Sequence, residues 1–192
     1  MQLIYGVGIK DIKVPHRDAA YSRWSAMLRR CYCPHLWEGV KHQTYEGCTV
    51  HEDWKYLSNF REWAHSEPGF RHPHSCLDKD ILVFGNKMYS PDAATFVPRE
   101  INIALTFSNA KRGEYPLGVY LSRIRSTGPV YRMALNRGNL GRLLKDFRDV
   151  DEAAEYYRVE KVKHLSYLAD KYRDWLRQDV YETLKDFDLK VQ

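Results

Sequence analysis

The spacing of apolar residues predicts two short helices in the first third of the chain. From Asp18 onward, apolar side chains recur at intervals of three and four, which places them on one face of a helix. The first set is Tyr21, Trp24, Met27, Leu28 and Cys31, and Pro34 ends it. The second set is Trp54, Leu57, Phe60, Trp63 and Ala64, and it stops at Pro68-Gly69. Residues 35–47 are predicted to form a loop, and the large aromatics suffice for a small core.

The middle of the chain predicts the order strand, turn, strand, helix. Residues 76–83 are apolar and β-inclined, and Gly85-Asn86 follows as a turn. A second short strand is expected at residues 95–97, and Pro98 stands where it can begin a helix. That helix would bury Ile101, Ala104 and Leu105.

The last third predicts three strands packed on one long helix. Residues 131–136 alternate strictly, so Tyr131, Met133 and Leu135 face one side. Arg132, Ala134 and Asn136 face the other side. Asp149 or Asp151 can cap a helix whose apolar positions recur at helical spacing from Ala153 to Leu176. Residues 111–116, rich in Gly, Pro and charge, are predicted to link two domains.

Composition is that of a globular protein, with 192 residues of which 44% are hydrophobic. No run approaches the ~20 apolar residues of a membrane helix, and Met1 to Lys10 lack the pattern of a secretion signal. We therefore expect a soluble, cytoplasmic protein without a membrane partner. The four cysteines lack the dense pairing of small secreted domains, which favours thiols or metal ligands over disulfides. The formal charge of +5 is modest, so the placement of basic residues matters more than their number.

One polar cluster has the residue types needed for metal-assisted phosphodiester hydrolysis. That reaction needs an oxygen ligand for a divalent ion, a base for water, and a polar side chain that orients both. Asp78 or Asp80 would hold the ion, and His72 or His74 would be the base. Asn86 and Asn102 would orient the reacting groups. The alternative is that these are solvated charges at strand ends and histidines in loops.

Three stretches of the chain together carry a family resemblance. The first comprises Tyr21-Ser-Arg-Trp24-Ser-Ala-Met27-Leu-Arg-Arg-Cys31-Tyr, Tyr45-Glu-Gly47-Cys-Thr-Val-His-Glu-Asp-Trp54 and Phe60. The second is Leu77-Asp78-Lys79-Asp80 with Tyr89-Ser-Pro91. The third comprises Leu117-Gly118-Val119-Tyr120, the alternating strand Tyr131 to Asn136, Asn136-Arg137-Gly138, Leu144 to Phe147 and Asp151-Glu-Ala-Ala154. In this order and spacing they resemble the phage and mobile-element HNH (homing-type) endonucleases that carry an ethylene-response-factor-type DNA-binding domain at their C-terminus, and the resemblance runs from about Tyr21 to Glu182.

For the nuclease motif, the resemblance implies that Asp78 holds a divalent metal, Mg²⁺ or Mn²⁺, and that Asn102 supplies the last polar residue. Two positions depart from the family pattern: Lys79 replaces the usual general-base histidine, and Ala93 replaces a metal-binding asparagine. A protonated lysine suits phosphate contact better than base catalysis. Either His72 or His74 substitutes as the base, or the protein is a catalytically degenerate DNA-binding phage protein that acts as a regulator or against host machinery.

For the C-terminal module, the resemblance implies three strands in the major groove of double-stranded DNA, braced by the helix. The residues expected to face DNA are Arg123, Arg125, Arg132, Asn136, Arg137 and Arg142. The alternation of residues 131–136 supports a common face for Arg132 and Asn136 independently. The alternative is an ordinary solvated sheet face.

A structural zinc site is a further alternative, with Cys31, Cys33, Cys48 and His51 as ligands. Its Cys-x-Cys start departs from the usual Cys-x-x-Cys, and Cys31 lies on an apolar helix face. The remaining histidines are read as surface residues: His16, His35, His42, His65 and His164.

Together these observations predict an α+β protein. Residues 15–110 would form an HNH-like ββα-metal nuclease domain. Residues 116–192 would form the DNA-binding domain, a three-stranded antiparallel sheet packed on a long helix, with a C-terminal helical extension. The predicted function is a DNA endonuclease or nickase whose C-terminal sheet chooses the site. If the protein is phage-encoded, its compartment is the cytoplasm of a bacterial host.

Overall fold

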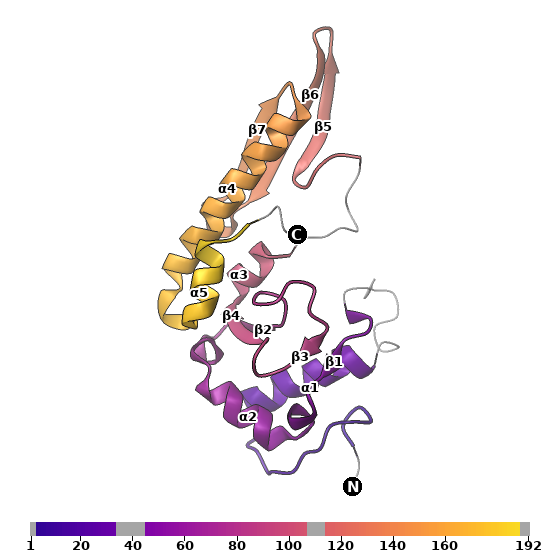
Figure 1. Cartoon of the computed structure of the whole chain (residues 1–192), viewed down its shortest axis with the longest axis vertical. Helices are drawn as coiled ribbons and strands as arrows, with labels where there is room; N and C mark the ends of the chain where they lie inside the picture. Colours follow the sequence, from indigo (N-terminus) through magenta and orange to yellow (C-terminus); the bar gives the residue numbers. More distant parts are fainter. Residues whose placement is uncertain (1–2, 34–44, 107–113, 189–192) are drawn as a thin grey trace. The chain divides into compact units, whose positions relative to one another are not determined.

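The computed structural model describes residues 3–33, 45–106 and 114–188 (Figure 1). The chain divides into two compact units, one formed by Met1–Pro98 with Asp174–Val180 and the other by Arg99–Arg173 with Tyr181–Gln192. Both helices and sheets are present, as the α+β prediction requires. Within the described ranges, no helix combines the length and apolar character needed to cross a lipid bilayer.

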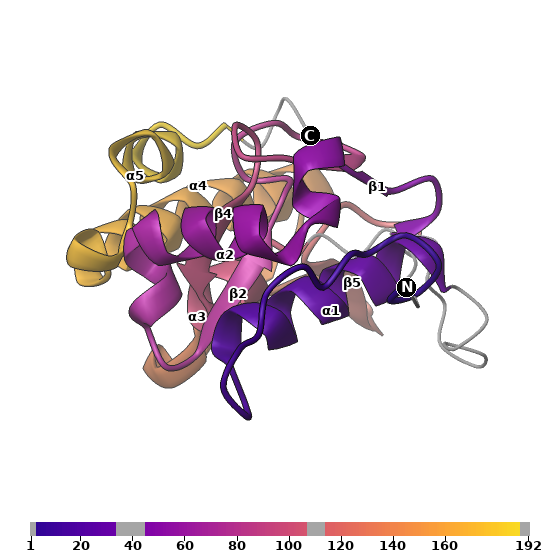
Figure 2. The same cartoon turned by 90° about the horizontal axis from the view of Figure 1, so that it is seen from below.

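The first helix of the first unit, α1 (Ala19–Tyr32), confirms the prediction from apolar spacing. Asp18 caps its start, because Asp18 Oδ1 accepts a hydrogen bond of 2.8 Å from the Tyr21 amide. Trp24, Met27 and Leu28 are fully buried along the predicted face. Trp24 Nε1 donates to the Trp54 carbonyl at 2.7 Å, which satisfies its only donor inside the core. Figure 2 shows α1 beside α2 (Leu57–Ser66).

The second helical pattern is divided between two elements. Trp54 lies in a short 3-10 helix, Glu52–Lys55, and α2 begins only at Leu57. Between them Tyr56 is extended, because Ile9 pairs with it: the Ile9 amide donates to the Lys55 carbonyl, and the Leu57 amide donates to the Ile9 carbonyl. A single helix through Trp54 was therefore a wrong prediction. The N-terminal segment takes hydrogen bonds that a continuous helix would have made itself.

Two small sheets complete the first unit. Strand β2 (Ser75–Asp78) pairs antiparallel with β4 (Thr95–Pro98), with Asp78 opposite Thr95. Strand β1 (Thr49–Val50) pairs parallel with β3 (Met88–Tyr89), a pairing that the sequence did not predict. The strand predicted over residues 76–83 ends early, because the Asp78 side chain accepts hydrogen bonds from amides just beyond it and turns the chain.

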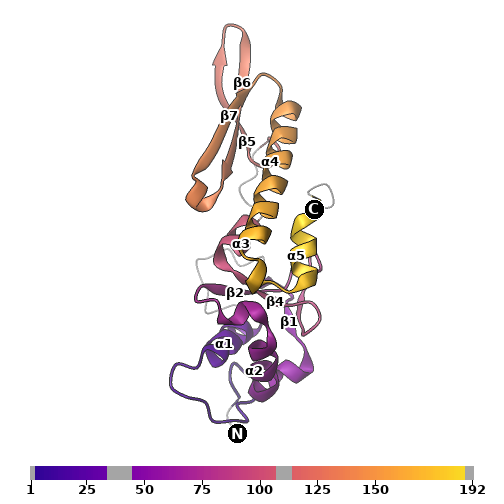
Figure 3. The same ribbon diagram turned by 90° about the vertical axis from the view of Figure 1, so that its left-hand side faces the viewer.

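The second unit contains the three-stranded antiparallel sheet on a long helix that the sequence predicts. The strands are β5 (Val119–Arg125), β6 (Gly128–Asn136) and β7 (Arg142–Phe147), in that order, and α4 (Val150–Lys171) lies along one face (Figure 3). Met133 and Leu135 are buried against α4 together with Tyr157. Tyr131, predicted to lie in the core, is half-buried on the same side and contacts Tyr115.

Helix α4 starts where the sequence predicts, but it ends at Lys171, before the predicted end at Leu176. The Asp149 side chain caps it by accepting from the Glu152 amide at 2.8 Å. Tyr172 is the C-terminal cap, so Trp175 lies in a following 3-10 helix, Arg173–Trp175, and α5 (Gln178–Lys185) follows. His164, predicted to lie on the surface, is only 5% exposed. The prediction was wrong because His164 shares the buried helix face with Leu165 and Leu168.

Helix α3 (Arg99–Ala104) belongs to the second unit, so the units divide after Pro98 and not at residues 111–116. The cause is Glu100, whose Oε2 accepts from Lys171 Nζ at 2.5 Å and from the Tyr172 hydroxyl at 2.6 Å. These bonds tie α3 to the end of α4. Of the predicted linker, residues 111–113 lie outside the described residues.

Candidate nucleic-acid interface

The face of the β5–β7 sheet opposite α4, here called the open face, carries polar and basic side chains. The strand register sets Tyr120, Arg132 and Asp146 side by side, and it sets Asn136 beside Arg142. These positions alternate with Met133 and Leu135, which pack on α4, so they point away from the helix. The prediction that Arg132 and Asn136 share one face is confirmed. Among the described residues of the second unit, no helix or strand covers this face.

A β-bulge brings Arg123 onto the open face. The register moves from Leu121 opposite Tyr131 to Arg123 opposite Val130, so Ser122 is an extra residue in β5. Arg123 Nη2 then donates to Asp146 Oδ2 at 2.9 Å, on the same face as Arg132. Plain alternation from Tyr120 would have turned Arg123 toward the helix. Arg125, two residues further, is exposed opposite Gly128 near the hairpin tip.

Asp146 lies at the centre of a hydrogen-bonded group that spans the three strands. Its Oδ1 accepts from Arg132 Nε at 2.6 Å, and its Oδ2 accepts from Arg132 Nη2 at 3.0 Å. The Tyr120 hydroxyl also hydrogen-bonds to Arg132. The hydrogen bonds and positive charge of Arg132, followed by those of Arg123, lower the pKa of Asp146 to about 2. Sequence reasoning missed Asp146, because the β6–β7 register that pairs it with Arg132 is visible only in the structure.

The net positive charge of the protein is concentrated in this segment. From Val119 to Phe147 there are six basic residues and one acidic residue. Because the whole chain has 30 basic and 25 acidic residues, the remainder contains 24 of each. The modest charge of the whole chain therefore equals the excess in the sheet. Two apolar groups, Tyr120 and Leu144, are exposed on the same face at 39% and 46%.

Arg137 differs from the other predicted DNA-facing residues. Its Nε is buried without a hydrogen-bond partner, and it lies close enough to His164 on α4 to help lower the pKa of that imidazole. The predicted placement toward DNA is therefore corrected to a placement toward the helix. The reason is local: Arg137 precedes the 3-10 turn Gly138–Leu140, so the alternation of β6 does not extend to it.

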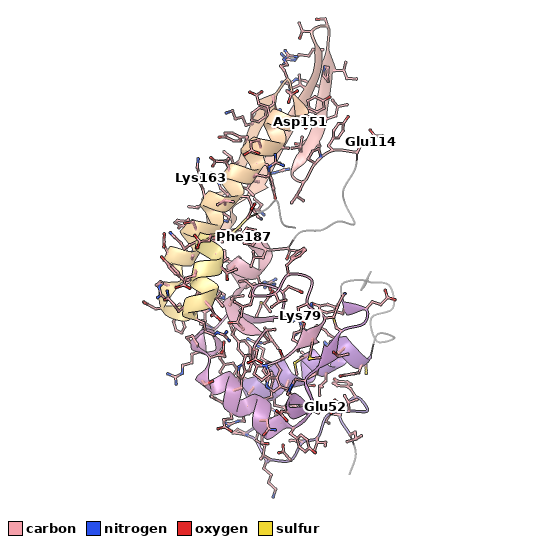
Figure 4. All side chains as sticks on the ribbon, in the orientation of Figure 1. Glu52, Lys79, Glu114, Asp151, Lys163 and Phe187 are labelled. Carbon is pink, nitrogen blue, oxygen red and sulfur yellow. The ribbon has the colours of Figure 1, made fainter. Side chains whose placement is uncertain are left out.

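The polar cluster of the first unit turns its charges inward. Asp78 Oδ1 accepts from the amides of Asp80 at 2.8 Å and Ile81 at 2.9 Å, while burial raises the pKa of Asp78. Lys79 is only 3% exposed, and its Nζ donates to both carboxylate oxygens of Asp80, at 2.7 and 2.8 Å, and to the Asn86 carbonyl (Figure 4). Asn86 in turn donates to the carbonyls of Lys79 and Met88. Lys79 therefore organises the loop, which corrects its expected role as a phosphate contact.

The two histidines lie at the other end of β2 from Asp78. His74 immediately precedes this strand and Asp78 ends it, four residues later, which corresponds to about 13 Å along an extended chain. His72 Nδ1 accepts from the His74 amide at 3.3 Å, and the His72 ring lies 5.4 Å from that of Trp175. Burial, followed by the charge of His74, lowers the pKa of His72. The extended strand thus keeps the predicted base away from the predicted metal ligand.

Asn102, the third predicted member of the nuclease site, lies on α3 in the second unit. Its carbonyl accepts from the Thr106 hydroxyl at 3.0 Å within the same helix end. The pairing of Asn102 with Asp78 remains a prediction.

The four residues predicted as possible zinc ligands are buried, partly buried or otherwise hydrogen-bonded in the structure. Cys33 and Cys48 are buried, and burial, with a contribution from Cys48, raises the pKa of Cys31 to about 12. His51 Nδ1 accepts from the Asp53 amide and so caps the 3-10 helix. Within residues 3–33, 45–106 and 114–188, no three His, Cys, Asp or Glu side chains converge as metal ligands would. His35 and His42 lie outside the described residues.

Comparisons with models of known families, with curated proteins and with solved structures found no match to this chain. The class of the protein therefore follows from its own fold and surface. It is an α+β protein with a basic, open three-stranded sheet braced by a helix.

Proposed function

We propose that this protein binds double-stranded DNA by inserting the open face of β5–β7 into a groove. The observation that carries the proposal is the excess of five positive charges in Val119–Phe147, with Arg123, Arg132 and Arg142 on or beside the face that α4 leaves uncovered. A polyanionic duplex is the partner that such a surface attracts.

The side chains of the open face suit both backbone and base contacts. Arginine donates in bidentate fashion to guanine and also to phosphates, whereas Asn136 can pair with adenine. Exposed Leu144 offers an apolar contact for a thymine methyl group, and Tyr120 offers a further polar or stacking contact. The ethylene-response-factor resemblance implies the same geometry, in which a helix supports the strands from behind.

Fluorescence anisotropy with a labelled random duplex of about 20 base pairs tests the proposal, with salt varied from low to physiological concentration. Binding should weaken steeply with salt, because each phosphate contact releases counterions. The double variant Arg132→Ala/Arg142→Ala should lose about tenfold or more in affinity. If the wild-type protein does not bind the duplex at low salt, the proposal fails.

A matched control removes two positive charges from the helix side. Arg158 and Lys163 lie on α4, each paired with a glutamate three residues earlier, as Arg132 is paired with Asp146. Figure 4 labels Lys163 on this helix. Arg158→Ala/Lys163→Ala should leave affinity within about twofold, since these residues lie on the bracing helix. Equal losses in the two double variants would indicate a general charge effect without a defined face.

Of the two biological roles predicted from the sequence, the geometry favours a DNA-binding regulator or a factor that acts against host machinery. Lys79 neutralises Asp80, Asp78 Oδ1 is engaged by two amides, and the histidines are at the far end of β2. As arranged, these residues do not fit a metal-dependent hydrolytic site. To hold Mg²⁺ or Mn²⁺, Asp80 would have to release Lys79.

A nuclease of the HNH type is the second candidate. Its supporting observation is the proximity of the Asp78 and Asp80 carboxylates, which repel each other and help raise the pKa of Asp78. Incubation with supercoiled plasmid and magnesium or manganese tests it, and Asp78→Ala should abolish any nicking. An absence of nicking at micromolar protein that still binds DNA would exclude this candidate.

A further inference from the structure

Asp146 is the single acidic residue between Val119 and Phe147, and it lies among the arginines of the open face. Its carboxylate accepts two hydrogen bonds from Arg132, on β6, and one from Arg123, on β5. One side chain of β7 therefore binds guanidinium groups from both of the other strands of the sheet. The β-bulge at Ser122 is what allows Arg123 to reach it.

Stability does not explain this arrangement. The side chains of Arg123, Arg132 and Asp146 remain 30–40% exposed, and exposed ion pairs contribute little to folding. A carboxylate in a phosphate-binding surface also weakens its attraction for DNA. Neither folding stability nor affinity for DNA therefore accounts for an acidic residue at this position.

We propose that Asp146 is a positioning residue that gives the sheet its preference among DNA sequences. This inference rests on the proposed DNA binding. Asp146 holds the guanidinium groups of Arg123 and Arg132 in place before DNA arrives, which reduces the side-chain entropy lost on binding. Arginine has five N–H donors, so both guanidinium groups retain donors for guanine edges.

The negative charge of Asp146 also favours selectivity among DNA sequences. It lies beside the two arginines and repels phosphates that approach them in non-cognate registers, so contacts with the backbone alone are weakened. Base contacts made by the fixed guanidinium groups are retained. Selectivity thus increases while affinity for random sequence decreases.

The decisive variant is Asp146→Asn, which keeps the shape of the side chain and removes its charge. Wild-type and variant proteins are each used to select duplexes from a randomised pool, and affinities are measured for the selected and the random duplexes. The variant should bind random duplex about threefold more tightly, with a salt dependence steeper by about one phosphate contact. Its ratio of selected to random affinity should fall about tenfold.

Two controls separate positioning from charge. Glu155→Gln removes one negative charge from α4, where Glu155 pairs with Arg158, and should leave the ratio unchanged. Asp146→Glu keeps the charge and should recover part of the ratio. In the DNA-free protein, the NMR signal of Arg132 Nε–Hε should be protected from solvent exchange, and this protection should be lost in Asp146→Asn.

The outcomes distinguish the inference from the function on which it rests. If the wild-type protein binds no duplex at low salt, the proposed function fails and the inference fails with it. If it binds duplex but Asp146→Asn leaves the affinity ratio unchanged, or selection enriches no sequence, the positioning role is overturned while DNA binding stands. A variant that weakens binding to random and selected duplexes equally also overturns it.

Discussion

The segment from Asp78 to Asn86 and the open face of the β5–β7 sheet are both rich in charge, but they use it in opposite ways. In the first, Lys79 is buried and binds Asp80 and a carbonyl of its own loop. In the second, the basic side chains outnumber the single acidic one and remain partly exposed. Charge that is satisfied internally shapes a loop, whereas charge in excess of its partners is available to another molecule.

The largest effect that distinguishes the two regions is expected from Lys79→Met. Removal of the ammonium leaves Asp80 and the Asn86 carbonyl without their shared donor, which should lower the free energy of unfolding by about 2 to 4 kcal/mol. Urea unfolding followed by circular dichroism measures the loss. Lys13→Met, at an exposed position in the same unit, is the control and should have little effect. Equal stability of the two variants would show that the buried lysine does not organise the loop.

The next effect concerns Lys161, a buried cation on the helix side of the sheet. Burial lowers its pKa from 10.5 to about 8, so the unfolded chain binds the proton more tightly than the folded one. Stability should therefore rise as pH increases from about 8 to 10.5, by an amount on the order of 3 kcal/mol. Below pH 8 the cost of the buried charge is fully present.

Lys161→Met should be more stable than the wild type at pH 7, and the difference should shrink as pH approaches 10.5. Unfolding free energies of both proteins across this range test the prediction. A difference that stays constant with pH would contradict it. The comparison with Lys79 is direct, because both lysines are buried: Lys79 Nζ lies 2.7 Å from a carboxylate oxygen of Asp80, whereas burial lowers the pKa of Lys161.

A smaller effect distinguishes two aspartates, one in each region. The pKa of Asp146 is lowered to about 2, so its contribution to stability is present above pH 3.8 and lost as pH falls toward 2. The pKa of Asp78 is raised by burial, so its contribution has the opposite sign: stability is lost as pH rises above 3.8. Carboxyl carbon NMR titration should find Asp78 titrating at higher pH than Asp146. The reverse order would contradict the burial of Asp78 and the binding of Asp146 by arginines.

How much of this could be predicted from sequence depends on the range of the interaction. Helix α1 and the start of α4 were predictable, because caps such as Asp18 and Asp149 and the spacing of apolar residues act within a few positions. The alternation of β6 likewise placed Arg132 and Asn136 on one face. These features depend only on the spacing of residues within one helix or strand and on the residues at its ends.

Features that depend on partners far along the chain could not be predicted. The extended backbone at Tyr56 depends on pairing with Ile9, and the assignment of α3 depends on the bonds of Glu100 to Lys171 and Tyr172. The bulge at Ser122 changed which arginines share a face, and the register of β7 brought Asp146 among them. For the candidate site, residue types were predictable while their pairing was not.

The smallest expected effect concerns the stability of the sheet itself. Arg132→Met removes a side chain that bonds to Asp146 and Tyr120, but Arg132 and Asp146 are partly exposed, so solvent can replace the lost bonds. The thermal unfolding midpoint should therefore change by no more than about 2 °C. Duplex affinity of the same variant should still fall clearly, because the lost guanidinium faces the proposed ligand and not the core. A large loss of stability with unchanged DNA affinity would reverse the comparison and make the open face a structural network like that of Lys79.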